Sequence, residues 1–182
     1  MPSRPDADRL ALVQLARAAV RECVLKQSLA AETSDKAVFA ERCGVFVTLR
    51  IGERLRGCIG VLEGREPLGR LIPRCAVSAA LEDPRFAPVT QDELEELRIE
   101  LSLLSPLVPS RADDIVIGTH GIMVTCGERR GVLLPQVAAE HDWSVEEFLA
   151  QTCQKAGLPR DAWRSPDAEI SSFMTEVLRE AD

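Results

Sequence analysis

Close pairs of metal ligands are missing from the sequence. Its 182 residues include only two histidines, His120 and His141, and its six cysteines form no Cys-x-x-Cys pair. Structural zinc sites usually take ligands from such pairs, so the spacing predicts no metal site. Cysteines scattered through apolar segments also favour free thiols over a disulfide framework.

Long apolar runs and an excess of positive charge are missing as well. No apolar stretch approaches the ~18–20 residues of a membrane helix, and the N-terminal sequence MPSRPDADRL lacks a signal peptide's apolar region. We therefore expect no membrane segment and a cytoplasmic protein. A formal net charge of −7 argues against general nucleic-acid binding, which needs clustered Lys and Arg. A local basic face of Arg50, Arg54, Arg56 and Arg85 stays open.

What is present is typical of a globular protein. Hydrophobic residues make up 46% and charged residues 28% of the chain, whose length suits one domain, or one domain with a small lobe. Residues 1–182 are therefore read as a single domain. The sequence contains no Walker motif, no dinucleotide fingerprint and no Ser-His-Asp spacing, so these common chemistries are not indicated.

Apolar residues at helical spacing predict helices over residues 8–30 and 67–82, and Pro73 inside the second pattern marks a site for a kink. Thr90 with Glu93 forms a capping-box pattern that predicts a short acidic helix. Ser144 with Glu147 predicts a helix running to Lys155. Three cysteines fall on these apolar stripes and are predicted to pack in the core: Cys23, Cys75 and Cys153.

Alternating apolar and β-branched residues predict hairpins over residues 44–64 and 121–135 and a strand over residues 98–105. The segment PLVPSRADD breaks the pattern and is predicted to cross between lobes. The spacing in residues 170–178 fits either a helix or a strand. The combination predicts an α+β fold with a mostly antiparallel sheet packed by helices.

The register of the first hairpin decides where Cys58 points. A two-residue loop at Gly52 and Glu53 would mix arginines into the apolar face, so a three-residue loop is preferred. That register puts one set of side chains on the apolar face: Val45, Val47, Leu49, Ile51, Leu55, Ile59 and Val61. The opposite face then receives Thr48, Arg50, Arg56, Cys58 and Gly60.

Three roles are open for Cys58, which lies in the hexapeptide LRGCIG, residues 55–60. As a small residue it fills a gap, while Gly57 and Gly60 allow close backbone packing or a bulge. As a nucleophile it would benefit from neighbouring arginines, because positive charge favours the thiolate. As a lining residue it would contact a ligand. Packing or passive lining is preferred, because no base is paired with this cysteine in the sequence.

Other candidate site residues come from three short motifs. In DPRF, Arg85 held by Asp83 would recognise a carboxylate or phosphate, but a helix-ending turn with Phe86 in the core is preferred. His120 in GTHG suits a general base or a turn residue equally. Gln136, after the strand in GVLLPQV, would read a ligand edge, although a proline there more often only ends a strand.

Six ordered blocks resemble the AMMECR domain family, whose prokaryotic members are called AmmeMemoRadiSam system protein A. The blocks are GVFVTLR, LRGCIG, AVSAALEDPRFAPVTQDELEELRIELSLLSP, GTHGIMV, GVLLPQVAAEHDW and FLAQTCQKAGL, and LRGCIG is the hexapeptide that marks the family. The resemblance covers about residues 9–178. Relatives tend to end on an aromatic and an acid, where this chain has TEVLREAD.

The resemblance implies an α+β fold with a larger and a smaller lobe and the hexapeptide near a groove between them. It also implies an association of gene neighbourhoods with a Memo-like protein and a radical SAM protein, which are therefore the possible partners. The resemblance supplies no reaction and leaves the cofactor unknown. The preferred hypothesis is a binding module that uses Arg56, Gly57, Cys58, Gly60, Arg85, His120 and Gln136. The alternative is an enzyme with Cys58 as thiol nucleophile and Arg56 in the same groove.

Overall fold

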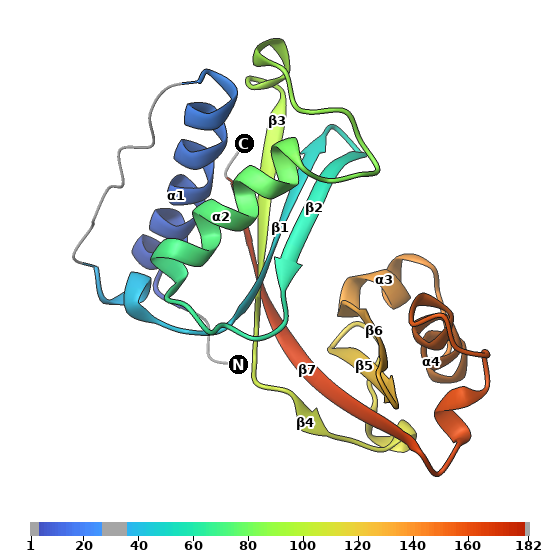
Figure 1. Ribbon diagram of the computed structural model, residues 1–182. Coiled ribbons are helices and arrows are strands. Elements are labelled where there is room, and N and C mark those ends of the chain that lie inside the picture. Colours follow the sequence, from blue (N-terminus) through green and yellow to red (C-terminus); the bar gives the residue numbers. More distant parts are fainter. Residues whose placement is uncertain (1–3, 27–35, 181–182) are drawn as a thin grey trace. The chain divides into compact units, whose positions relative to one another are not determined.

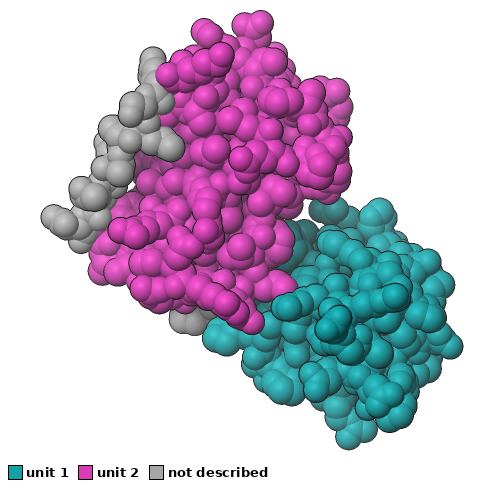
Figure 2. Space-filling view, in the orientation of Figure 1, with its two compact units in different colours: residues 1, 105–175 teal, residues 2–104, 176–182 magenta. Residues whose placement is uncertain are grey.

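The computed structural model describes residues 4–26 and 36–180 of the chain. The described residues form two compact units: unit 2 takes those before residue 105 and after residue 175, and unit 1 takes residues 105–175 (Figure 2). The chain leaves unit 2 after Leu104, immediately before the predicted crossing segment PLVPSRADD, and returns to it after Thr175. Each unit has its own core, so each is described separately.

Two helices cover one face of the sheet in unit 2 (Figure 1). Helix α1 spans Asp6–Val24 and helix α2 spans Leu68–Leu81. The prediction for α2 is confirmed, and Pro73 lies inside the helix without ending it. Helix α1 ends earlier than the predicted residue 30, and residues 27–30 of that prediction lie outside the described residues. In the described part of the chain, no helix is long and apolar enough to cross a bilayer.

The sheet of unit 2 has the strand order β2-β1-β3-β7, with β2 at its edge. Strand β1 spans Gly44–Ile51, β2 spans Arg54–Val61 and β3 spans Leu97–Leu104. Alternate side chains of β1 and β3 point toward the helices, as the period-two pattern predicts. Members of this inner face are fully buried: Val45, Val47, Leu49, Ile99, Leu101 and Leu103.

The first hairpin has features of both loops considered in the sequence analysis, the two-residue loop and the three-residue loop. Val47 pairs with Ile59 and Leu49 with Gly57, as predicted, but Ile51 pairs with Arg54 across a two-residue turn. A bulge at Arg56 reconciles the two registers, because it adds one residue to β2 opposite the junction of Leu49 and Arg50.

One predicted assignment within this hairpin is therefore wrong. Leu55 pairs with Arg50, on the face away from the helices, instead of joining the apolar face. The extra residue of the bulge shifts Leu55 to the other side of the pleat.

Unit 1 is built on a second group of strands in the order β4-β7-β5-β6. Strand β4 spans Val108–Pro109, β5 spans His120–Cys126, β6 spans Arg129–Leu133 and β7 spans Ala168–Arg179. The second hairpin is thus confirmed, with its turn at Gly127 and Glu128. The tail, for which helix and strand were both open, is a strand whose last residues belong to unit 2.

Helices α3, Pro135–Glu140, and α4, Val145–Lys155, accompany these strands. Phe148, Leu149 and Cys153 of α4 pack with Ile122 and Val124 of β5. The predicted capping box holds at α4, where the Ser144 hydroxyl accepts a hydrogen bond from the Glu147 amide at 3.2 Å. Helix α3 was not predicted, because Pro135 was expected only to end the strand and instead occupies the first helical position.

Short 3-10 turns complete the connections at Ala37–Ala40, Gln91–Glu93, Ala112–Asp114 and Ala162–Arg164. The turn at Gln91–Glu93 stands where a short acidic helix was predicted. All strand pairings whose registers are described are antiparallel, and helices pack on the strands of both units, so the α+β prediction is confirmed.

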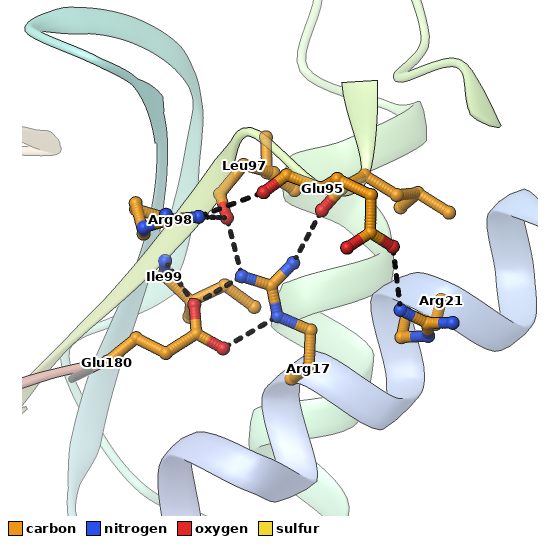
Figure 3. A network of polar contacts seen from close by, with 8 residues as sticks. Arg17, Arg21, Glu95, Leu97, Arg98, Ile99 and Glu180 are labelled. Atoms are coloured by element: carbon orange, nitrogen blue, oxygen red, sulfur yellow. Dashed lines mark hydrogen bonds and ion pairs between the residues drawn. The ribbon is translucent and has the colours of Figure 1, made fainter. Parts of the chain in front are cut away.

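Glu180, which follows β7, is held against β3 by a network of polar contacts (Figure 3). The Glu180 amide donates to the carbonyl of Ile99 at 3.1 Å, and the Glu180 carboxylate accepts from the Ile99 amide at 3.2 Å. Arg17 of α1 pairs with the same carboxylate and donates to the backbone carbonyls of Leu94 and Leu97. This acidic residue thus satisfies strand groups that lie at the end of β3.

Candidate functional site

The LRGCIG hexapeptide lies on β2, at the edge of the unit 2 sheet. Its two glycines stand where the backbone is crowded. A Cβ atom on Gly57 would lie 2.1 Å from the carbonyl oxygen of Ala79 in α2. One on Gly60 would lie 2.3 Å from the carbonyl oxygen of Val45 and 2.5 Å from the Phe46 ring. Close backbone packing therefore explains both glycines.

The backbone of Cys58 faces the open edge of the sheet, where no further strand pairs with it. Its amide donates to Oδ2 of Asp83 at 2.9 Å, and its carbonyl accepts from Nη2 of Arg85 at 3.1 Å. These two side chains come from the loop after α2 and take the place of a neighbouring strand. An edge that would otherwise expose unpaired backbone groups is closed in this way.

Asp83 and Arg85 also bind each other through two parallel contacts, Nε to Oδ1 at 2.9 Å and Nη2 to Oδ2 at 2.7 Å. The Arg85 guanidinium is the main cause that lowers the pKa of the Asp83 carboxyl, and the Cys58 and Arg85 amides act in the same direction. Asp83 is 4% exposed, whereas Arg85 remains exposed. The helix-ending turn preferred for DPRF is present, and the same aspartate also binds the hexapeptide. The expected place of Phe86 in the core is wrong, because Phe86 is only partly buried and lies beside the Arg85 guanidinium.

Arg56 points from the bulge of β2 to the segment that leads into β3. Its guanidinium donates to Glu93 at 2.6 and 2.9 Å and to the carbonyls of Ala87 and Pro88 at 2.7 and 3.0 Å. Hydrogen bonding to Arg56 is the main cause that lowers the pKa of Glu93 to about 2. Glu93 in turn accepts from the Thr90 amide at 2.8 Å. The contacts of Arg56 thus hold the segment from Ala87 to Glu93 against β2.

The thiol of Cys58 lies on the face of the sheet away from α1 and α2. Its partner across the strands is Thr48, and Sγ lies 3.3 Å from the threonine hydroxyl oxygen, with either atom able to donate. Thr48 is nearly buried and Cys58 partly buried. The Arg85 guanidinium also interacts with the Cys58 side chain, so within the described residues the thiol contacts a hydroxyl and a cation but no base.

We call this side of the unit 2 sheet the outer face. Its residues near the hairpin tip are Thr48, Arg50, Leu55, Cys58, Arg98 and Glu100. They come from three adjacent strands and form two rows across the sheet, one through Cys58 and Thr48 and one through Leu55 and Arg50. The outer face therefore carries one thiol, one apolar side chain and several charges beside the rigidly held hexapeptide.

The two remaining predicted site residues belong to unit 1. Nδ1 of His120 accepts a hydrogen bond from the Val116 amide at 3.1 Å, a contact that is typical of a turn residue. Gln136 is the second residue of α3, close in the chain to the end of β6, and it also has a polar interaction. The register of β5 with β6 puts both residues at the same end of this hairpin.

Sequence reasoning brought together Arg56, Gly57, Cys58, Gly60 and Arg85, and the structure gathers these five in unit 2. It missed Glu93 as the partner of Arg56, having used this residue only in a capping box. Long-range ion pairs leave no spacing signal in the sequence. Across the described residues, no three His, Cys, Asp or Glu side chains converge as metal ligands would.

Comparisons with known proteins find similar sequences over nearly the whole chain. The model of the AMMECR1 family matches residues 13–178. A protein of Methanothermobacter thermautotrophicus is 41% identical over 93% of this chain and 92% of its own length. Protein MK0488 of Methanopyrus kandleri is 43% identical over 94% of this chain and 87% of its own.

A solved structure gives the same result in three dimensions. The crystal structure of the uncharacterised protein PH0010 from Pyrococcus horikoshii superposes with a TM-score of 0.90 at 37% identity, covering 97% of this chain and 93% of that one. That protein is described as uncharacterised, so the likeness supplies a fold and not a reaction.

Proposed function

The chain belongs to the AMMECR1 family, and from this premise we propose that it is a cytoplasmic binding module that presents the outer face of unit 2 to a partner protein. The partner expected from the family resemblance is a Memo-like protein or a radical SAM protein of the same pathway. The LRGCIG hexapeptide supplies one edge of this binding surface. In this role the protein performs no chemistry on its own.

The proposal is supported mainly by the contacts of the two arginines in the LRGCIG and DPRF motifs. Arg56 is occupied by Glu93 and two backbone carbonyls, and Arg85 by Asp83 and the Cys58 carbonyl. All three guanidinium nitrogens of Arg56 make these contacts, and Arg85, although half exposed, is held through its Nε and Nη2. Both arginines fix the 83–93 loop to an edge strand, and a fixed surface loses little conformational entropy when a partner binds.

The second candidate is an enzyme with Cys58 as its nucleophile. It draws support from the Arg85 guanidinium, which lies beside the Cys58 backbone with Nη2 3.1 Å from its carbonyl oxygen. The same guanidinium interacts with the Cys58 side chain, and a cation of this kind favours the thiolate. A cysteine nucleophile normally also has a base in contact with the thiol. Within the described residues the thiol contacts the Thr48 hydroxyl and a cation but no base, so the binding role is preferred.

Capture of partners from the native source tests the binding role. We would tag the full chain and compare the wild type with Leu55→Gln, which removes an apolar side chain from the outer face without adding charge. The matched control is Leu10→Gln, because Leu10 is 54% exposed on α1, away from that face. We expect Leu55→Gln to reduce recovery of the Memo-like or radical SAM protein about tenfold, as loss of a central apolar contact does.

Equal recovery of the same partners by both leucine variants would contradict the proposal. Iodoacetamide addresses the second candidate separately. Alkylation of Cys58 near neutral pH much faster than that of a free thiol, whose pKa is ~8.5, would favour the nucleophile instead.

A further inference from the structure

Two arginines face each other on the outer face of unit 2. Arg50 of β1 and Arg98 of β3 are direct partners in the antiparallel register. Side chains in this position have their Cβ atoms about 4.5–5.5 Å apart, and like charges directly opposite destabilise a sheet. The sequence did not predict that these two arginines meet, because they are far apart in the chain.

Neither guanidinium is neutralised within the described part of the chain. Nη1 of Arg50 donates to the Glu53 carbonyl at 3.2 Å, and Nη1 of Arg98 donates to the carbonyls of Glu95 and Leu97 at 3.0 and 3.2 Å. These acceptors are backbone oxygens without net charge. Each contact uses one nitrogen, which leaves the other guanidinium donors for an incoming group.

Other arginines at the same end of the sheet differ from this pair, because they bind carboxylates. Figure 3 shows Arg17 bound to the Glu180 carboxylate and Arg21 bound to that of Glu95, while Arg98 reaches backbone oxygens instead. In the next row of the outer face, Glu100 is paired with Arg179 at 2.8 Å. The carboxylates of Glu95, Glu100 and Glu180 are thus engaged elsewhere, and none of these three neutralises the two arginines.

We propose that Arg50 and Arg98 bind the phosphate group of a small phosphate monoester. A phosphate monoester carries a charge of about −1.5 to −2 at pH 7, which matches two guanidinium groups and removes their repulsion. Guanidinium also donates two parallel hydrogen bonds to phosphate oxygens. A single carboxylate would leave one positive charge uncompensated.

The surroundings favour a small ligand over a nucleic acid. The chain has a net charge of −7, which repels an extended polyanion, whereas a single phosphate group senses mainly the local pair. Leu55 pairs with Arg50, and Thr48 and Cys58 form the next row of the outer face. The rest of the ligand would lie against Leu55 and Cys58, which are partly exposed, and not against Thr48, which is buried. This inference rests on the proposed function, since it gives the ligand chemistry of the same outer face.

Thermal unfolding of the full chain with inorganic phosphate tests the site without any partner. Sodium phosphate is titrated at pH 7 against sodium chloride of matched ionic strength, and O-phosphoserine, serine and acetate serve as further probes. We expect phosphate and O-phosphoserine to raise the Tm by about 3–6 °C for each tenfold excess over Kd. Serine and acetate should behave like chloride.

Variants locate the effect. Arg50→Gln and Arg98→Gln should each raise the Kd for phosphate about tenfold or more, the loss expected for a charged hydrogen-bond pair. Arg70→Gln on α2 is the matched control and should leave the Kd unchanged. Arg98→Glu should raise the Tm without phosphate, because it replaces a like-charge pair by an ion pair, and should remove the phosphate effect.

Three results would overturn the inference. They are an equal phosphate response in wild type and Arg50→Gln, an acetate response as large as that of phosphate, and a lower Tm for Arg98→Glu in phosphate-free buffer. Nε–Hε resonances of labelled arginines provide a direct check, since those of Arg50 and Arg98 should shift on titration with phosphate while that of Arg70 does not. Because no partner protein is present, this outcome is independent of partner capture.

Discussion

The Arg56–Glu93 ion pair makes a quantitative prediction about acid stability. Glu93 titrates with a pKa of about 2 in the folded protein, against an ordinary value of 4.5, mainly because it accepts hydrogen bonds from Arg56. A depressed carboxyl pKa contributes stability above the unfolded-state pKa, and this contribution is lost as the pH falls through the folded-state pKa. The relevant window therefore runs from about pH 5 down to about pH 2.

The size of this contribution follows from the same values. A shift from 4.5 to about 2 corresponds to at most roughly 3.4 kcal/mol, at 1.36 kcal/mol per pH unit. The side chains of Glu93 and Arg56 are 25% and 14% exposed, so solvent screens part of their attraction. We expect Glu93→Gln to lower the free energy of unfolding at pH 7 by on the order of 2 kcal/mol.

Urea unfolding of wild type and Glu93→Gln at a series of pH values measures this quantity. The gap between the two proteins should be constant from about pH 7 to pH 6 and fall to about half or less near pH 3. Combining Arg56→Gln with Glu93→Gln should cost less than the sum of the single changes, with a coupling of about 1 kcal/mol or more. A gap that does not change with pH would refute the ion pair as its source.

Two further predictions concern packing. Gly57→Ala should destabilise by about 3 kcal/mol, because its Cβ would lie 2.1 Å from the Ala79 carbonyl oxygen, whereas Gly52→Ala should cost only about 1 kcal/mol, since its φ of +56° is strained but its surroundings are open. Similar losses in chemical denaturation would show that α2 does not press on β2. Cys75→Ala and Cys153→Ala should each cost about 1 kcal/mol, because both thiols are buried, and unchanged melting of both would contradict their place in the two cores.

Local sequence patterns predicted the regular helices and strands, because the burial of one face determines the spacing of their apolar residues. The buried positions of α2, including Leu71 and Ile72, were recovered from a helical repeat, and those of β3, such as Ile99 and Leu101, from alternation. The bulge at Arg56 was not recovered. The local sequence allowed two loop lengths for this hairpin, and the bulge combines the registers of both. The ion-pair partner of Arg56 at the bulge, Glu93, is far away in the chain and left no local signal.

The tail shows a different limit. Helical spacing is shared by Ile170, Phe173, Val177 and Leu178, whereas one strand face would hold Ser171, Phe173, Thr175 and Val177. Pairing with β5 makes this segment a strand, in which Phe173 lies opposite Gly121. A Cβ atom on Gly121 would lie 2.4 Å from the Phe173 ring, so this glycine accommodates the aromatic side chain. Tertiary pairing of this kind overrides local propensity.

The candidate site was predicted in its residues but not in its connections. LRGCIG and DPRF were both noted in the sequence, yet the hydrogen bond from the Cys58 amide to Asp83 joins them only in the fold. Likewise, Arg50 and Arg98 lie opposite each other because of the strand register, which the sequence alone does not reveal. Sequence patterns name the groups, and topology determines which of them meet.

Replacement of Cys58 by serine tests the central claim, that the hexapeptide builds a binding surface and does not supply a nucleophile. Cys58→Ser nearly preserves volume and leaves a hydroxyl facing Thr48. The measurement is growth of a strain that lacks the native gene, under a condition in which this loss impairs growth, after introduction of wild type, Cys58→Ser or Leu55→Gln. We expect Cys58→Ser to restore growth like wild type and Leu55→Gln to fail. Normal folding of Cys58→Ser together with failure to restore growth would contradict the claim and assign the function to the thiol.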